Sequence, residues 1–346
     1  MTKPTTVDMT FDTSLIDVSR PQNQSSDQQS ILNTSFSTTE SDPSMYDNIL
    51  SADAQSTPTI PQTQPESQDT PKQSQASSLS PLPRQSTPVQ YIQTQDAYNA
   101  WASVYDTDGN MLQSIDDVEL TTLLPDFLSL VQPSVPSSTA LTLIDLGCGT
   151  GRNTAKLLQY AWPQERKVQV TALDFSQGML DVAASKLSTL AHGRRDLALR
   201  LEQCDCFPTD TDRATSPMPA VQGLKAADGI VSTLVLEHVS LPPYFATLSS
   251  LVKNGGYALV TNMHSEMGMM SQAGFVNQEG VKVRGKSYAH SPQETAEEAQ
   301  RCGFEVLVCK ERGMEKDDVD NGRVGSRGGK WVGVKVWYGL LMRKTG

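Results

Sequence analysis

Long apolar runs and paired cysteines are both scarce in this chain of 346 residues. No apolar stretch approaches the roughly 20 residues that a helix needs to cross a bilayer, and the N-terminal MTKPTTVDMTFD lacks the apolar core of a secretory signal. The five cysteines are odd in number and lie mostly on strand or helix patterns, which favours reduced thiols over a disulfide framework. We therefore expect a cytoplasmic protein, with the nucleus left open, and no membrane partner.

Basic residues are also outnumbered. There are 28 Lys and Arg against 39 Asp and Glu, so the formal net charge is −11. Phosphate contacts need Lys and Arg, and without a basic stripe we do not expect a nucleic-acid substrate. Cys204 and Cys206 do not have the usual spacing of a metal pair and no His lies near them in sequence. We expect no metal ion.

Aromatic residues are rare in the first quarter of the chain. Residues 1–90 hold three of the 21 aromatics, no Trp and no Cys, but ten of the 20 prolines among many Ser, Thr and Gln. Such a segment cannot bury enough apolar surface to offset its chain entropy. The sequence predicts a disordered tail over 1–90 and one α/β domain over 91–346.

A glycine loop is the most informative feature that is present. In LTLIDLGCGTGRNT, residues 141–154, an apolar run reaches Asp145 and is followed by Gly147, Gly149 and Gly151, after which a helical pattern begins. Glycines at this spacing allow a tight turn and the close approach of a ligand. The free N–H groups of the next helix point into the same space, which favours a cofactor that carries an anionic group.

The residue at position 152 does not fit the glycine pattern of a dinucleotide cofactor site. The G-x-G-x-x-G fingerprint would place its third glycine there, and this chain has Arg152. Asp145 would repel a pyrophosphate but attract a cofactor that bears an ammonium group. The D-x-G-x-G-x-G pattern resembles the first motif of the class I S-adenosylmethionine-dependent methyltransferases. Taken alone, the motif also fits an ordinary glycine-rich strand-to-helix turn.

Acidic residues end the next two predicted strands. Asp174 follows strand 167–173, about 20 residues past the glycines, and its two oxygens match the two hydroxyls of a ribose. Asp205 follows strand 198–204, where the methyltransferase pattern places an acidic residue against the adenine amino group. Ligands of open parallel sheets bind at this edge, so the order of these features strengthens the resemblance.

The resemblance implies an α/β fold with a Rossmann-like, mostly parallel seven-stranded sheet, order 3-2-1-4-5-7-6, helices on both faces and an N-terminal helical lid. The alternating patterns predict strands 141–146, 167–173, 198–204, 228–234, 256–263, 304–310 and 331–342, and helices 151–161, 177–190, 242–252 and 292–302. A charged loop is expected over 311–330. Two further segments, 94–130 and 264–290, are expected to cover the pocket.

The expected cofactor-binding residues lie in the glycine loop, at the strand ends and in the first added segment. They are Tyr105, Asp145, Gly147, Gly149, Gly151, Asp174, Phe175, Asp205, Cys206 and Leu234. The resemblance identifies the cofactor as S-adenosyl-L-methionine, converted to S-adenosyl-L-homocysteine. Tyr105 is placed over its methionine part and Trp101 against the acceptor, with core packing as the alternative for both.

A general base is needed only when the acceptor carries a proton that must leave. The catalytic candidates are Glu237 and His238, just past the fourth strand, and His264 at the end of the fifth. A purely structural role is the alternative for Glu237 and His238, and His264 could reach the acceptor. Leu241-Pro-Pro-Tyr244 is similar to a motif of base-methylating enzymes, but it lies too far past the strand and follows Ser240, so we interpret it as a first helical turn.

Two further runs narrow the resemblance. WASVYDTDGNMLQ, residues 101–113, and KWVGVKVW, residues 330–337, are similar to fungal small-molecule methyltransferases, the group that includes the amide N-methyltransferase of gliotoxin biosynthesis. This implies methyl transfer to an O or N atom of a small molecule in secondary metabolism. A protein methyltransferase or a regulatory methyltransferase-like protein, recruited through the tail, is the alternative. The acceptor and the oligomeric state are left open.

Overall fold

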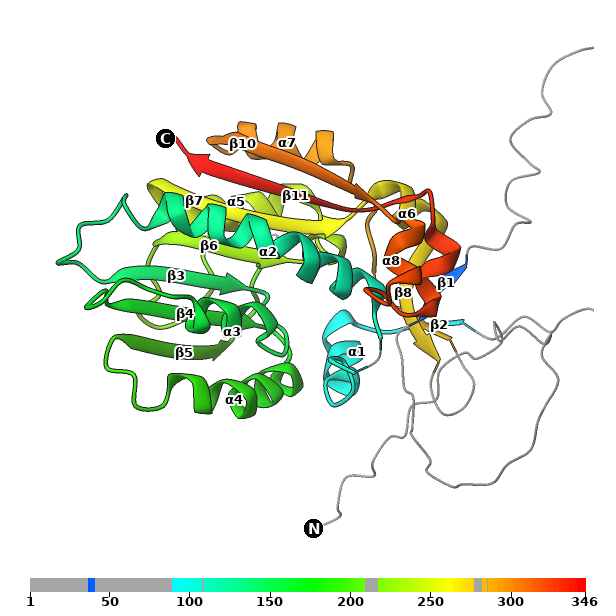
Figure 1. The fold of residues 1–346 in the computed structure, drawn as a ribbon, viewed down its shortest axis with the longest axis horizontal. Coiled ribbons are helices and arrows are strands. Elements are labelled where there is room, and N and C mark those ends of the chain that lie inside the picture. The colour runs from blue at the N-terminus through cyan, green and yellow to red at the C-terminus, as the bar shows by residue number, and fades with distance from the viewer. Residues whose placement is uncertain (1–36, 41–88, 108, 209–216, 277–281, 285) are drawn as a thin grey trace, which may run out of the picture.

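The computed structural model describes residues 37–40, 89–107, 109–208, 217–276, 282–284 and 286–346 (Figure 1). Its centre is a seven-stranded sheet in the order β5-β4-β3-β6-β7-β11-β10. The strands are β3 (Leu141–Leu146), β4 (Val168–Asp174), β5 (Leu197–Gln203), β6 (Ala227–Thr233), β7 (Val252–Met263), β10 (Phe304–Gly313) and β11 (Lys335–Lys344). Numbered within this sheet alone, the order is 3-2-1-4-5-7-6, which confirms the predicted topology.

The first five of these strands run parallel, and β11 lies antiparallel between β7 and β10. The register pairs Leu146 with Leu173 and Asp174 with Gln203, so β3, β4 and β5 end level with one another. The glycine loop after β3 and the acidic residue that ends β4 therefore meet at one edge of the sheet, as ligand sites of parallel sheets require.

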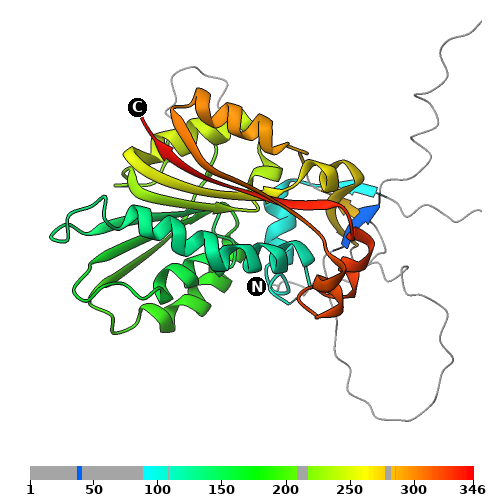
Figure 2. The same ribbon diagram turned by 45° about the horizontal axis from the view of Figure 1, so that its top comes forward.

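Helices cover both faces of the sheet (Figures 1 and 2). One face packs against α2 (Met111–Val131), α3 (Arg152–Gln159) and α4 (Gln177–Ala191), and the other against α5 (Leu241–Leu251) and α7 (Pro292–Arg301). Leu259 and Val260 are neighbours in β7 and are fully buried in the two opposite cores. This alternation is the period of two that a strand buried on both faces shows.

The expectation that both halves of 94–130 cover the pocket is half wrong. The first half forms α1 (Thr94–Trp101), which lies beyond the carboxyl ends of the strands (Figure 1). The second half forms α2, whose Leu120, Phe127 and Leu128 are at most 2% exposed in the core over β7 and β11. The many apolar residues of this helix favour burial on the sheet over a position at a solvent-facing lid.

The predicted charged loop over 311–330 also needs correction. β10 runs on to Gly313, α8 (Lys316–Asp320) and η3 (Ser326–Trp331) follow, and β11 begins four residues later than expected. The guanidinium of Arg312 contacts both oxygens of buried Asp318, at 2.8 and 2.7 Å. This pair fastens α8 to the end of β10 and gives structure to a segment whose composition resembles a loop.

A second, smaller sheet has the order β1-β8-β9-β2. Its strands are β1 (Ser37–Glu40), β8 (Ser271–Val276), β9 (Lys282–Arg284) and β2 (Val89–Tyr91), and α6 (Ser265–Met270) precedes β8. Residues 37–40 and 89–90 lie within the segment 1–90 that is predicted to be disordered, and they pair with β8 and β9. The rest of that prediction lies outside the described residues.

Candidate active site

A cavity of about 740 Å³ lies at the carboxyl edge of the central sheet. The glycine loop, the ends of β4 and β6, helix α1 and the segment after β9 line it. The predicted site residues on its wall are Tyr105, Gly147, Gly149, Asp174, Phe175, Asp205, Cys206, Leu234 and His238. Segment 264–290 reaches the cavity through Lys286 and Tyr288, as expected.

Asp174 organises the glycine loop as well as lining the cavity. One carboxylate oxygen accepts the backbone N–H of Gly149 and the other accepts that of Ser176, both at 2.8 Å. Burial raises the pKa of Asp174, although these backbone donors oppose the rise. Gly149 has a φ of +54° and no atom within 4 Å of the place where a Cβ would stand, so the loop is open to a ligand there.

Gly151 does not line the cavity. Its φ is +78°, and a Cβ would come within 2.8 Å of Leu187 Cδ1 and 3.2 Å of Ala183 Cβ, both on α4. The third glycine of the motif is therefore needed for the packing of α3 against α4. Its expected contact with the cofactor stays a prediction, and the structure shows this packing role.

Asp145 is also absent from the cavity wall. It is 1% exposed and accepts a hydrogen bond from Thr154 Oγ1 at 2.5 Å. Burial raises the pKa of Asp145 to about 6, since a carboxylate is poorly solvated there. The structure thus places this side chain behind the loop, tying β3 to α3, whereas the sequence predicted direct contact with an ammonium group.

Leu234 marks an unusual backbone position where β6 meets the cavity. Its φ is +56°, in the left-handed region that residues other than glycine rarely adopt. Its N–H donates to the carbonyl of Thr261 in β7 at 2.9 Å, which holds the turn in place. Non-glycine residues in such conformations cluster at functional sites, and here the turn leads into η2 (Leu236–His238).

His238 faces the cavity and has partners on both ring nitrogens. Nε2 lies 2.7 Å from the Tyr98 hydroxyl and 3.3 Å from Glu237 Oε1, and Nδ1 lies 3.3 Å from the carbonyl of Lys286. A carbonyl only accepts, so Nδ1 carries the proton in the neutral ring and Nε2 accepts from Tyr98. Burial by itself would lower the pKa of His238, but the hydrogen bond and charge of Glu237 outweigh it and raise this pKa.

Glu237 lies behind His238 and outside the cavity wall. It is 7% exposed, and its backbone N–H donates to Asn262 Oδ1 at 2.9 Å while its carbonyl accepts from Tyr288 at 2.7 Å. Its Oε2 atom has no hydrogen-bond partner among the described residues. These contacts place Glu237 where it acts on His238, and they do not bring it to a ligand.

His264 is far from the predicted catalytic position. Its Nε2 lies 3.1 Å from Glu311 on β10, and its Nδ1 accepts the N–H of Glu266 at 3.1 Å. β7 extends past the end of β6 and pairs there with β11, so its last residues turn toward that side of the sheet. The structure gives His264 a hydrogen-bond partner on β10, and His264 does not line the cavity.

Tyr98 is a cavity residue that the sequence analysis missed. Tyr98, Trp101 and Tyr105 recur at helical spacing, and this period was the available signal. The ring of Trp101 is 5.0 Å from that of Tyr105 in a T-shaped contact, and Trp101 is 1% exposed, so it packs behind the wall. Asn99, on the same helix, accepts hydrogen bonds from Ser176 and Gly178, which fasten α1 over the strand ends.

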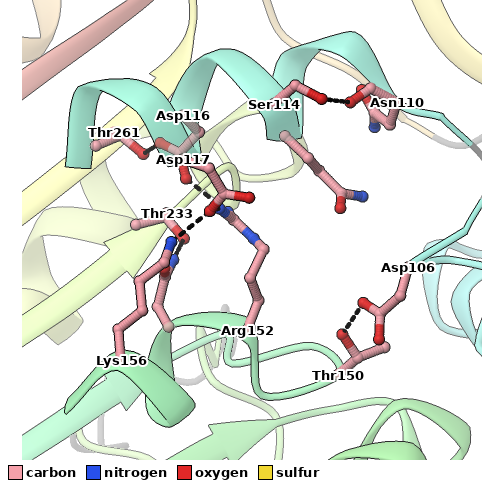
Figure 3. Close-up of polar contacts among 12 residues, drawn as sticks. Asp106, Asn110, Ser114, Asp116, Asp117, Thr150, Arg152, Lys156, Thr233 and Thr261 are labelled. Atoms are coloured by element: carbon pink, nitrogen blue, oxygen red, sulfur yellow. Dashed lines mark hydrogen bonds and ion pairs between the residues drawn. The ribbon is translucent and has the colours of Figure 1, made fainter. Parts of the chain in front are cut away.

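Arg152 is a second residue whose role was missed. It lines the cavity, and its guanidinium bonds Asp116 at 2.5 Å and Asp117 at 2.6 Å on α2 (Figure 3). Asp116 is fully buried and also accepts from Thr261 at 2.6 Å and from Trp337 at 2.8 Å. Helix α2 therefore reaches the cavity indirectly, through the arginine that it holds.

Within the described part of the chain, no group of three or more His, Cys, Asp or Glu side chains is placed to hold a metal ion. Among the same residues, no helix is long and apolar enough to span a membrane.

The fold and the cavity define a class of protein that comparisons with known proteins identify. A methyltransferase domain family matches residues 144–258. An uncharacterized methyltransferase of Emericella nidulans is 43% identical over 267 residues, which cover 73% of this chain and 91% of that protein. The chain belongs to the class I S-adenosylmethionine-dependent methyltransferases, and S-adenosylmethionine is its cofactor.

Solved structures show more distant likeness. The [4+2]-cyclase SpnF is 15% identical with a TM-score of 0.46, and the match covers 75% of this chain and 99% of SpnF. An S-adenosylmethionine-dependent methyltransferase of Mesorhizobium loti is 16% identical with a TM-score of 0.41, covering 62% of this chain and 95% of that one.

Proposed function

We propose that this methyltransferase transfers the methyl group to an O or N atom of a small-molecule acceptor in secondary metabolism. The observation that carries the proposal is the cavity, in which a histidine with an accepting ring nitrogen faces a space of about 740 Å³. This volume is within the roughly 300–1,000 Å³ of small-molecule sites. Helix α1 and the segment after β9 border it.

The residues at one side of the cavity fit the cofactor. A carboxylate has about four lone-pair sites, and the backbone N–H groups of Gly149 and Ser176 use two of those on Asp174. The two that remain match the two hydroxyls of a ribose. Asp205 and Cys206 follow on the neighbouring strand end and would border the adenine. The open space at Gly149 leaves room for the rest of the cofactor.

The bound cofactor supplies an activated methyl group on a positively charged sulfur, which is a good leaving group. The remaining work of the protein is to hold the acceptor in line with that methyl and to exclude water. The aromatic rings of Tyr98, Tyr105 and Tyr288 line the cavity and provide flat apolar walls for an acceptor. Large apolar faces with polar tips suit a small, partly aromatic molecule.

His238 is the proposed general base. An acceptor O–H or N–H that replaces the Tyr98 hydroxyl at Nε2 would give its proton to this nitrogen as the new bond to carbon forms. The imidazolium that results would donate to Glu237 Oε1, which lies 3.3 Å away. Glu237 thus stabilises the protonated ring without touching the acceptor, and this makes it a positioning residue.

The support for secondary metabolism is the resemblance of 101–113 and 330–337 to fungal small-molecule methyltransferases. Both runs contribute to the cavity: Tyr105 lines it, and Trp337 bonds the aspartate that holds Arg152.

The test is to incubate the protein with methyl-labelled S-adenosylmethionine and, separately, with a metabolite extract and a protein extract of a filamentous fungus. We expect label in a low-molecular-mass product, stable to base when the new bond is an ether or an amine. Label that appears only in the protein extract would overturn the small-molecule proposal in favour of a protein substrate. The His238→Gln variant, run beside the wild type, separates enzymatic from background transfer.

A further inference from the structure

Lys286 is a cation on the cavity wall whose charge the proposed reaction does not use. It follows β9, it is exposed, and it lines the cavity. Its Nζ lies 5.0 Å from the centre of the Tyr288 ring, within the roughly 6 Å of a cation–π contact. Among the residues that the structure describes, no carboxylate lies within ion-pair distance of this ammonium group. The charge of Lys286 is therefore available to a molecule in the cavity.

The backbone around Lys286 is fixed to the proposed general base. The carbonyl of Lys286 accepts from Nδ1 of His238 at 3.3 Å. Two residues further on, the N–H of Tyr288 donates to the carbonyl of Glu237 at 2.7 Å. The ring of Tyr288 stacks on that of His290, with 5.2 Å between the ring centres and 11° between their planes. The ammonium group thus lies over a ring whose place relative to the base is set by these contacts.

The other charged groups of the wall have partners or belong to the cofactor side. Arg152 pairs with Asp116 and Asp117 on α2. Asp174 and Asp205 border the places proposed for the ribose and the adenine. Among the described wall residues, the side left to the acceptor therefore carries one full charge, that of the lysine. It is positive, although the net charge of the chain is −11.

A positive wall selects a negatively charged acceptor. S-adenosylmethionine carries a sulfonium, so a cationic acceptor would be repelled by both the cofactor and the lysine. An anionic group would be attracted by both. The attraction is stronger in a cavity than at an open surface, because low-dielectric walls concentrate the field of the charges that line it.

The chemistry of the wall narrows the kind of anion. A single ammonium is a compact point charge, and it balances one carboxylate but not a phosphate of charge near −2. The rings of Tyr98, Tyr105 and Tyr288 line the same cavity and suit a flat aromatic body. A carboxylate is already ionised at neutral pH and has no proton to give to a base. The group that meets His238 must then be a different one, with an O–H or an N–H.

We propose that the acceptor is an aromatic carboxylic acid that carries a separate hydroxyl or N–H group. Its carboxylate pairs with Lys286, and its hydroxyl or N–H reaches Nε2 of His238. A lone pair of that oxygen or nitrogen forms the bond to the methyl carbon, the electrons of the methyl–sulfur bond stay on sulfur, and the proton goes to Nε2. The inference rests on the proposed function and names the class of its acceptor.

The charge of the acceptor is tested without knowing its identity. A metabolite extract of a filamentous fungus is loaded on an anion-exchange resin at pH 7. Carboxylic acids are released at pH 2, about two units below their pKa of about 4, whereas phosphates and sulfates keep a negative charge and need salt. The flow-through, the acid-released and the salt-released fractions are each incubated with the protein and methyl-labelled S-adenosylmethionine. We expect a labelled product, stable to mild base, from the acid-released fraction.

Variants of Lys286 test the contact itself, with a dilution series of the acid-released fraction as substrate. Lys286→Gln should lower kcat/KM by about 5- to 50-fold, between the contribution of an exposed ion pair and that of a charge-assisted hydrogen bond. The change should be in the apparent KM, with kcat nearly unaltered, since the contact binds the acceptor before and during transfer. Lys286→Arg keeps the charge and should restore most of the loss. The dissociation constant of S-adenosylhomocysteine should be the same in all of these proteins.

Lys167→Gln is the matched control. Lys167 is also exposed and its carbonyl also accepts a hydrogen bond, from the backbone N–H of Leu141 at 2.9 Å. It precedes β4 at the opposite edge of the sheet and does not line the cavity. This variant should match the wild type on every fraction. Conversion of the acids in the fraction to methylamides should remove the difference between Lys286→Gln and the wild type.

Labelled product from the flow-through or the salt-released fraction alone would overturn the proposal, and so would a Lys286→Gln variant that matches the wild type on the acids. Label that mild base releases would also overturn it, because a methyl ester would place the carboxylate at the methyl group and not at Lys286. An unfractionated extract that gives no low-molecular-mass product would contradict the proposed function, and this result is distinct from a product formed from a neutral acceptor.

Discussion

Replacing Asp174 with alanine tests the proposed cofactor site most directly. Each oxygen of this carboxylate already accepts one backbone N–H, from Gly149 or from Ser176. Each oxygen would accept a second hydrogen bond from one hydroxyl of a ribose. Hydrogen bonds to a charged group contribute about 1.5–3 kcal/mol each. At the low end of that range, two such bonds amount to about 3 kcal/mol, or roughly a 100-fold weaker dissociation constant.

The same substitution also releases the glycine loop, because two backbone donors lose their acceptor. We expect a loss of about 1–3 kcal/mol in the free energy of unfolding for this reason. Calorimetric titration with S-adenosylhomocysteine measures the first effect, and urea unfolding without ligand measures the second.

Asp228→Ala is a matched control for Asp174→Ala. Both aspartates are 6% exposed and both accept a backbone N–H, but Asp228 lies near the start of β6, at the opposite end of the strands. Asp228→Ala should lower stability to a similar extent and leave the dissociation constant unchanged. Equal losses of affinity in the two variants would refute the reasoning, since affinity would then follow stability and not the ribose contact.

The remaining predictions concern the base, the loop and the tail. His238→Gln should lower kcat by about 10²–10⁴-fold with an unchanged cofactor dissociation constant, which steady-state kinetics and calorimetry check. Because His238 must be unprotonated to act and Glu237 raises its pKa, the wild-type rate should rise with pH through that raised value, and Glu237→Gln should move the rise to lower pH. A pH profile that Glu237→Gln leaves in place would contradict this pairing. Gly151→Ala should lower the free energy of unfolding in urea by about 1–3 kcal/mol more than Gly193→Ala does. Both glycines have a positive φ, but only Gly151 has no room for a Cβ. Equal losses would mean that α4 moves aside freely. Deletion of residues 1–36 keeps both β1 and β2 and should leave the melting temperature and the cofactor affinity nearly unaltered, and a large drop in either would show that this segment packs on the domain.

The strands and the edge of the sheet where the glycine loop lies were predictable because their signals are local, whereas the strand order followed from the resemblance to the family. Each strand was visible as an apolar run, and the alternation of strands with helices indicates a parallel sheet. Asp174 and Asp205 were predicted to meet the glycine loop because parallel strands end at a common edge, and the level register of β3, β4 and β5 confirms that placement.

The contacts that complete the cavity were not predictable, because they join distant parts of the chain. Tyr98 and His238 are 140 positions apart, and Asp116 is 221 positions from Trp337. Neither contact follows from a period or a spacing. Each depends on how α1 and α2 pack against the central sheet.

The sequence by itself determined the strands, the helices and the edge of the sheet where the glycine loop lies, since hydrophobic periods and glycine spacing act within a few residues. Its motifs also carried the resemblance that implied the strand order and the class of enzyme. Only the tertiary structure decided which polar residues reach the cavity. In the structure Asp145 lies in the core, His264 contacts Glu311 on β10, and Arg152 lines the wall of the cavity. The direction of a side chain depends on strand overlap and helix docking, and these are properties of the packed molecule.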